Sequence, residues 1–249
     1  IQACGAGLAA LFFSMVDILP FGWRSLYLVG LIPLGLVAYW RRNLPETGMF
    51  QSVQNAPDVK PESLFKPIAG LFRNSQRNLI LLCSVLFFFS MGASTAGFFA
   101  PKYLQDVHDW RPASVAIMMA LGGAFGIIGN PLAGWLSDRF GRKPTSIGFS
   151  ISFLVVAVTF YGAMGIFAPF LWIALIFFMM GTDVTISSYG TELFPTKVRS
   201  TAAGVRGIVA TLSAAIGLAA VSFLYSFVGS NWIAIIILCG IGIVTPILF

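Results

Sequence analysis

The chain has 249 residues, of which 57% are hydrophobic and only 10% are charged, and its mean hydropathy is +0.88. A soluble domain carries about 25% charged residues, so this composition excludes a water-exposed globular protein, and it also excludes a disordered chain. Because helices satisfy their own backbone hydrogen bonds in lipid, the sequence predicts an all-α polytopic membrane protein. A net charge of +6 could indicate nucleic-acid binding, so the positions of the basic residues have to decide that question.

Eight stretches are long and apolar enough to cross a bilayer, which takes about 20 apolar residues. They cover roughly residues 1–19, 24–41, 78–101, 112–136, 145–163, 167–190, 201–227 and 230–249. The first stretch begins without Met or a basic leader, so we expect the chain to be the later part of a longer protein. Many of the 26 Gly lie inside these stretches, where small residues let helices approach closely.

The basic residues alternate between the turns that join these spans. Eleven of the 15 lie in the even-numbered turns: Arg41, Arg42, Lys60, Lys66, Arg73, Arg77, Arg139, Arg142, Lys143, Lys197 and Arg199. The odd-numbered turns hold Arg24, Lys102 and Arg111. The positive-inside rule then places the even turns and both chain ends in the cytoplasm, for a multi-pass protein of the plasma (inner) membrane. The basic charge is a topology signal, which removes the case for nucleic-acid binding.

One even-numbered turn is much longer than the others. Residues 42–77 are polar and contain four Pro, which is typical of a central cytoplasmic linker. The predicted organisation is the last two helices of a first bundle at 1–41, the linker at 42–77, and a complete six-helix bundle at 78–249. Within the linker, residues 63–72 (SLFKPIAGLF) suit a plain linker or a short interfacial helix.

Three motifs follow one another along the chain. They are GWRSLYLVGLIPLGLVAYWRRNLPET (22–47), GWLSDRFGRKPT (134–145) and ELFPTKVRSTAAG (192–204). In order and spacing they resemble the sixth helix with its Pro-Glu-Thr exit, the Asp-Arg-x-Gly-Arg-Lys loop and the Pro-Thr-x-x-Arg segment of the major facilitator superfamily. The resemblance is nearest to sugar porters and metabolite–proton symporters. It implies the major facilitator fold, with this chain as helices 5–12 of 12 and an incomplete first bundle.

The resemblance also implies ion pairs on the cytoplasmic side that hold the outward-open state and break when the two halves rock. We expect this cytoplasmic gate to comprise Gly134, Asp138, Arg139, Gly141, Arg142, Lys143, Glu192 and Arg199. In it, Asp138 pairs with Arg139 or Arg142, or faces a helix N-terminus. Gly134 permits close helix contact and Gly141 a tight turn. The alternative is that the basic residues only enforce topology, which leaves Asp138 unexplained.

Two ionisable residues lie inside spans, where charges are costly and usually functional. Asp183 precedes Glu192 by nine residues and Arg206 follows Arg199 by seven, so both lie roughly 10–13 Å from the turn between their helices. We expect an Asp183–Arg206 pair that faces the central cavity and responds to protonation or to an anionic or hydroxylated substrate. Ser187, four residues after Asp183, extends the polar face. The alternatives are that Arg206 snorkels to the headgroups and that the pair is purely structural.

Weaker candidates for the substrate or proton pathway are Ser94, Thr95 and Asn130. Ser94 and Thr95 belong to the first span after the linker, which in the resembling family usually contacts substrate. Asn130 precedes Pro131, which interrupts the helical hydrogen-bond ladder. Hydroxyls that only pack between helices, and a tolerated kink, are the alternatives.

The sequence contains no nucleotide-binding G-x-x-x-x-G-K-[ST] motif, no Cys/His cluster and only one His. We therefore expect neither an enzyme nor a cofactor or metal. The predicted function is proton-coupled symport of a small polar metabolite, a sugar or organic acid, by alternating access around a midplane site. Its expected partners are the substrate, protons and the lipid bilayer, and the expected state is a monomer. Proton-coupled efflux of drugs or metabolites, and a non-transporting sensor or scaffold, are the alternatives.

Overall fold

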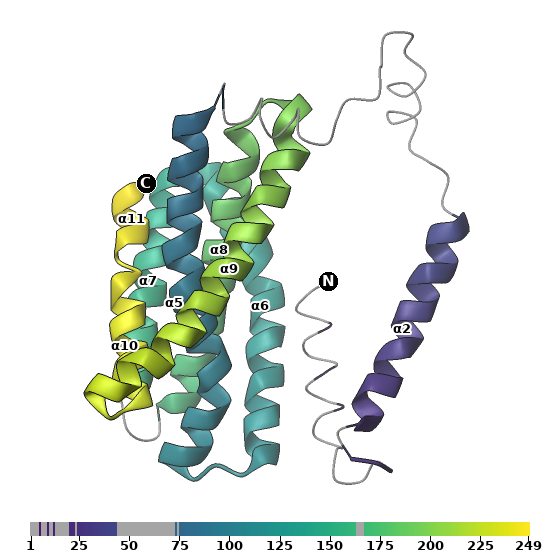
Figure 1. Cartoon of the computed structure of the whole chain (residues 1–249), viewed down its shortest axis with the longest axis vertical. Coiled ribbons are helices and arrows are strands. Elements are labelled where there is room, and N and C mark those ends of the chain that lie inside the picture. The colour runs from purple at the N-terminus through teal and green to yellow at the C-terminus, as the bar shows by residue number, and fades with distance from the viewer. Residues whose placement is uncertain are drawn as a thin grey trace.

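The computed structural model describes residues 5, 9, 12, 20–22, 24–43, 73, 75–162 and 167–249, apart from the side chains of Thr196 and Lys197. The helices in chain order are α2 (Arg24–Asn43), α5 (Gln76–His108), α6 (Pro112–Phe140), α7 (Arg142–Gly162), α8 (Ala168–Glu192), α9 (Thr196–Val228), α10 (Asn231–Ile241) and α11 (Val244–Leu248). In Figure 1, α5 to α11 form one upright bundle and α2 stands apart from it.

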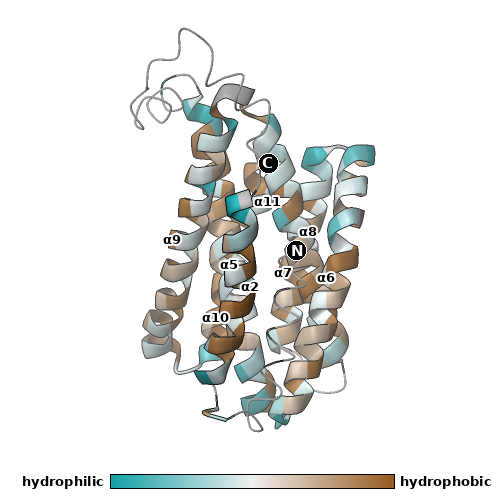
Figure 2. Ribbon diagram, turned by 90° about the vertical axis from the view of Figure 1, so that its right-hand side faces the viewer, coloured by the Kyte–Doolittle hydropathy of each residue, from teal (hydrophilic) through white to brown (hydrophobic). Residues whose placement is uncertain are grey.

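Six segments of the described part are long and apolar enough to cross a membrane. They are α5, α6, α7, α8, residues Val198–Val228 of α9, and Asn231–Leu248, which joins α10 and α11. These match the last six predicted spans, and Figure 2 shows hydrophobic residues along the middle of the helices with hydrophilic residues toward their ends. The predicted span 24–41 forms α2 but is not among the six, and the predicted span 1–19 lies largely outside the described residues.

Most of the predicted linker also lies outside the described residues. The division of the chain at 41 and 77 therefore stays a prediction. In the structure α5 begins at Gln76, two residues before the predicted span 78–101.

Gly and Pro set the ends of several helices. Pro112 opens α6 at a position where its missing N–H has no helical partner to lose. Gly141 separates α6 from α7 with φ +95°, a backbone conformation that glycine adopts without a side-chain clash. The motif at 134–145 thus covers the end of α6, the turn at Gly141 and the start of α7.

Glycines of α6 explain how closely that helix packs against α8. A Cβ added at Gly122 would lie 2.8 Å from the Trp172 ring, and one at Gly129 would lie 2.8 Å from the Phe177 ring. Trp172 also donates from Nε1 to the backbone oxygen of Met118 at 2.9 Å. Gly122, Gly126 and Gly129 therefore give α8 the close approach that small residues provide in membrane bundles.

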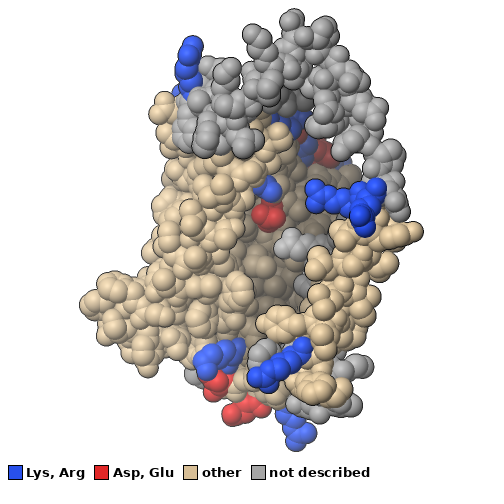
Figure 3. All heavy atoms as spheres, turned by 45° about the vertical axis from the view of Figure 1, so that its right-hand side comes forward, with Lys and Arg blue, Asp and Glu red and all other residues tan. Residues whose placement is uncertain are grey.

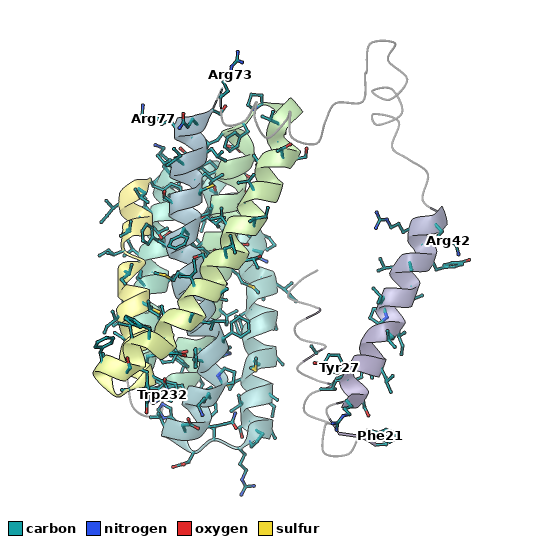
Figure 4. The ribbon with its side chains drawn as sticks, in the orientation of Figure 1. Phe21, Tyr27, Arg42, Arg73, Arg77 and Trp232 are labelled. Atoms are coloured by element: carbon teal, nitrogen blue, oxygen red, sulfur yellow. The ribbon has the colours of Figure 1, made fainter. Side chains whose placement is uncertain are left out.

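The second half of the bundle forms around α5, which packs against α9, α10 and α11. A Cβ at Gly217 of α9 would lie 2.9 Å from the Met91 backbone oxygen, so α5 and α9 are close at that level. Figure 4 shows Arg73 and Arg77 at one end of the bundle and Trp232 toward the other, with Arg42 at the end of α2 that is farther from Tyr27 and Phe21.

Candidate functional site

Arg142 is the centre of a charged cluster at the turn between α6 and α7. Its Nη2 and Nε lie 2.7 and 2.9 Å from Glu192 Oε1, and its Nη1 lies 2.7 Å from Asp138 Oδ1. Nη1 also donates to the Ser137 hydroxyl at 3.1 Å. We call these four residues, Ser137, Asp138, Arg142 and Glu192, the Arg142 cluster. It fastens the α6–α7 turn to the end of α8.

The cluster is solvent-accessible, with 67% of the Asp138 side chain and 53% of the Glu192 side chain exposed. Ion pairs this exposed contribute about 1 kcal/mol or less each. Ser137 is the exception, because it is 1% exposed and its hydroxyl accepts from the arginine. Sequence reasoning missed Ser137, and its place one residue before Asp138 gave no separate signal. The cluster therefore stabilises the contact between the α6–α7 turn and α8 only weakly, and breaking it costs little free energy.

The other predicted gate residues lie outside this cluster. The Arg139 guanidinium lies over the rings of Trp135 and Phe140, at 5.2 and 5.8 Å from their centroids. Lys143 donates to the backbone oxygen of Phe249 at 3.0 Å. The partner of Glu192 is Arg142, and the exposed Arg199 takes part in none of the ion pairs among the described residues.

Gly134 does not make the close helix contact that we expected within the described part of the chain. A Cβ added there would meet no atom within 4 Å. The reason is its place on α6, since the glycines that face α8 are Gly122, Gly126 and Gly129, and Gly134 lies outside that stripe.

A second group of charges lies inside α8 and α9, in the half of each helix nearer the turn that joins them. Arg206 of α9 donates from Nη1 to the Ser187 hydroxyl of α8, and Asp183 precedes Ser187 by four residues on the same helix. We call these three residues the Asp183 group. Asp183 is exposed, while Ser187 and Arg206 are half-buried. Figure 3 shows a small group of opposite charges in a hollow midway along one face, apart from the charges at the two ends.

The expected Asp183–Arg206 contact takes a different form in the structure. Arg206 is close enough to act electrostatically on the Asp183 carboxylate, yet the three ion pairs formed by the described residues do not include this one. The guanidinium donates to Ser187, which lies four residues nearer the α8–α9 turn than Asp183. The arrangement presents a cation and an anion side by side, each with capacity for a further partner.

The weaker candidates behave as packing groups. Thr95 is fully buried and donates to the backbone oxygens of Met91 and Gly92 at 3.0 and 2.9 Å, and Ser94 donates to Met91 at 3.2 Å. These hydroxyls are satisfied within their own helix. Asn130 differs, because its Oδ1 is buried without a hydrogen-bond partner among the described residues.

The described residues hold no group of three or more His, Cys, Asp or Glu side chains arranged for a metal ion. Two open grooves among them, of about 570 and 600 Å³, lie at the ends of the bundle, along Asp109–Met118 and between Gln76 and Leu248. Neither includes a member of the Asp183 group, which lies inside α8 and α9.

Comparison with known proteins places the chain in a family. The model of the Major Facilitator Superfamily matches residues 1–191. The chain belongs to this superfamily. Its members named among the relatives are transporters rather than enzymes, and the six apolar helices make this member a multi-pass membrane protein.

Two curated relatives of this superfamily member are transport proteins for small molecules. The chain is 31% identical over 223 residues to the cis,cis-muconate transport protein of Acinetobacter baylyi, covering 82% of this chain and 51% of that protein. It is 29% identical over 244 residues to the proline/betaine transporter of Escherichia coli, covering 84% and 46%. The chain thus spans about half the length of these relatives.

A solved structure supports the fold alone. It is a bacterial homologue of the iron transporter ferroportin in its inward-facing state, with a TM-score of 0.58 at 18% identity. The match covers 97% of this chain and 59% of that one.

Proposed function

We propose that the complete protein is a proton-coupled symporter of small organic acids that works by alternating access. The observation that carries this proposal is the Asp183 group, in which two opposite charges lie inside membrane-spanning helices without an ion pair between them. Charges at such positions are costly and mark substrate or ion pathways. The relatives support an organic acid over a sugar, because muconate, proline and betaine all carry a carboxylate.

The charges of Arg206 and Asp183 would couple the binding of substrate to the binding of a proton. Arg206 is a permanent cation with several N–H donors suited to a carboxylate, so it attracts the acid group of the substrate. Once Arg206 has that partner, Asp183 holds an uncompensated negative charge within a membrane-spanning helix. A proton on Asp183 removes this charge. Substrate and proton are therefore expected to occupy the site together.

The Arg142 cluster serves the gate by making one end of the bundle rigid. It joins the α6–α7 turn to the end of α8 within a single bundle, so it does not clamp two halves together by itself. It leaves Asp138 and Arg139 exposed at that end, where the preceding half of the transporter is expected to meet them. The basic residues gathered there support a cytoplasmic position for this end.

We extend the proposal to the surroundings of the protein. The complete protein is a monomer in the plasma (inner) membrane, and residues 1–41 supply the last two helices of its first bundle. Both ends of this chain then lie on the cytoplasmic side, as an even number of spans requires.

The test is uptake of labelled cis,cis-muconate, proline and glucose by cells that express the complete gene product, with and without a protonophore. We expect accumulation of a carboxylate that the protonophore abolishes. Asp183→Asn is expected to lose accumulation while retaining exchange of substrate across the membrane.

Each other outcome contradicts a named part of the proposal. Uptake of glucose but of neither carboxylate rejects the substrate class and keeps transport. Lower cellular content of the probes than in control cells indicates efflux. Unchanged accumulation by Asp183→Asn rejects Asp183 as the proton site. Movement of no probe in either direction rejects symport of these substrates and favours a sensor or scaffold.

A further inference from the structure

Arg206 has two possible partners on the facing side of α8. Ser187 follows Asp183 by four residues, so their side chains share one face of the helix about 6 Å apart along its axis. A flexible arginine side chain spans that difference by changing rotamers. Which of the two residues Arg206 bonds determines whether its guanidinium and the Asp183 carboxylate are available to a ligand.

The structure shows Arg206 on the neutral partner. Its Nη1 donates to the Ser187 hydroxyl, and Asp183 keeps an exposed carboxylate that is in no ion pair among the described residues. Without the Ser187 hydroxyl, Asp183 is the remaining polar partner for the guanidinium on this face of α8. An arginine already paired with a carboxylate binds a second anion weakly.

We propose that Ser187 is a positioning residue that holds Arg206 away from Asp183. Held there, Arg206 is open to the carboxylate of a substrate, and Asp183 is open to a proton. The net charge of the site is zero both when it is empty and when it holds the carboxylate and the proton. This inference rests on the proposed function and assigns within it a role to the hydroxyl of Ser187.

Among the described residues, Arg206 is the charged side chain beside Asp183. The helices packed against α8 are α5, α6, α7 and α9. Their other Lys, Arg, Asp, Glu and His residues lie toward the helix ends: Arg77, Lys102, Asp106 and His108 on α5, Asp138 and Arg139 on α6, Arg142 and Lys143 on α7, and Lys197 and Arg199 on α9. Of these, Lys102 pairs with Asp106 at 3.0 Å, and Arg142 pairs with Glu192, nine residues from Asp183.

The test is Ser187→Ala in the complete protein, with uptake of cis,cis-muconate and proline measured across pH. We expect KM for the transported carboxylate to rise about tenfold while kcat changes less, because one hydrogen bond that presents Arg206 is lost. We also expect the pH at which uptake falls by half to move to a lower value. The reason is that an Arg206–Asp183 ion pair stabilises the deprotonated carboxylate against the proton.

Two variants control for simple damage to the helix. Ser187→Thr keeps a hydroxyl and is expected to retain the original KM and pH profile. Ser188→Ala removes a hydroxyl about 100° around the same helix and is expected to change neither. If Ser188→Ala produces the same changes as Ser187→Ala, the effect belongs to the helix and the proposal is wrong.

A double variant isolates the pairing. In an Asp183→Asn background Arg206 has no carboxylate to turn to, so adding Ser187→Ala should raise the dissociation constant for the probe less than it does alone. Equal effects in both backgrounds overturn the proposal, as does Ser187→Ala with unchanged KM and pH profile. Binding of neither carboxylate by the purified protein also overturns it. A carboxylate transported normally by Ser187→Ala overturns it while leaving the proposed function standing.

Discussion

The Arg142 cluster and the Asp183 group each combine one arginine and one serine with acidic residues, two in the first and one in the second, but they lie in different surroundings. At the α6–α7 turn, Arg142 makes direct ion pairs to Asp138 and Glu192 and a hydrogen bond to Ser137. Inside α8 and α9, Arg206 holds only Ser187, and Asp183 stands beside it in no ion pair. The exposed site has its charges paired, and the site inside the spans does not.

The difference shows which site is arranged for a ligand. Water solvates an unpaired charge at the turn, so pairing there contributes little and serves to hold elements together. Inside a span an unpaired charge is costly, and a fold that leaves two such charges apart has a use for them. The following substitutions test this difference between the two sites, from the largest expected effect to the smallest.

Arg206→Gln removes the cation from the inner site. We expect uptake of the transported carboxylate to fall about 100-fold or more, because a partly desolvated charge pair is lost on binding. Arg206→Lys keeps the charge without the planar set of donors and should retain more uptake than Arg206→Gln. Initial uptake rates check both, and equal rates for Arg206→Gln and the parent protein would show that the inner charges are structural.

Arg142→Ala opens the outer cluster. It removes two exposed ion pairs of about 1 kcal/mol or less each, so we expect uptake to fall about fivefold to tenfold. Hydrogen exchange at residues 136–146 should become faster, because the turn is no longer fastened to α8. A loss as large as that of Arg206→Gln would contradict the contrast between the two sites.

Gly141→Ala strains the turn itself. An alanine at φ +95° is unfavourable by about 1 kcal/mol or more, which lowers the midpoint of thermal unfolding by about 2–4 °C. The matched control is Gly148→Ala on α7, where a Cβ meets no atom within 4 Å and no loss is expected. Equal midpoints for the two variants would mean that the turn does not need glycine.

Asp138→Asn removes the more exposed of the two carboxylates that pair with Arg142. We expect transport to slow about twofold to threefold, since Glu192 still holds the arginine. If transport rate and hydrogen exchange at the turn are both unchanged, Asp138 has no part in the gate.

The membrane helices could be predicted from the sequence because hydropathy alone carries that signal. The six spans from residue 78 on appear as α5 to α11, and the family resemblance drawn from three motifs agrees with the family match over residues 1–191. Residue types and their depth likewise predicted that Asp183, Ser187 and Arg206 share one region.

The partners within each site could not be predicted, because spacing does not give rotamers. Asp138 had two possible arginines, and the structure selects Arg142, which also takes Glu192. Arg206 was expected on Asp183 and is found on Ser187. The burial of Thr95 against α9 depends on how closely Gly217 lets α5 approach, which hydropathy does not encode.

The central claim is that the inner site binds an organic acid together with a proton on Asp183. The most direct measurement is proton uptake from weakly buffered solution when the purified complete protein binds cis,cis-muconate. The parent protein should take up a proton on binding, and Asp183→Asn should bind the probe without taking up a proton. Equal proton uptake by both proteins would contradict the account.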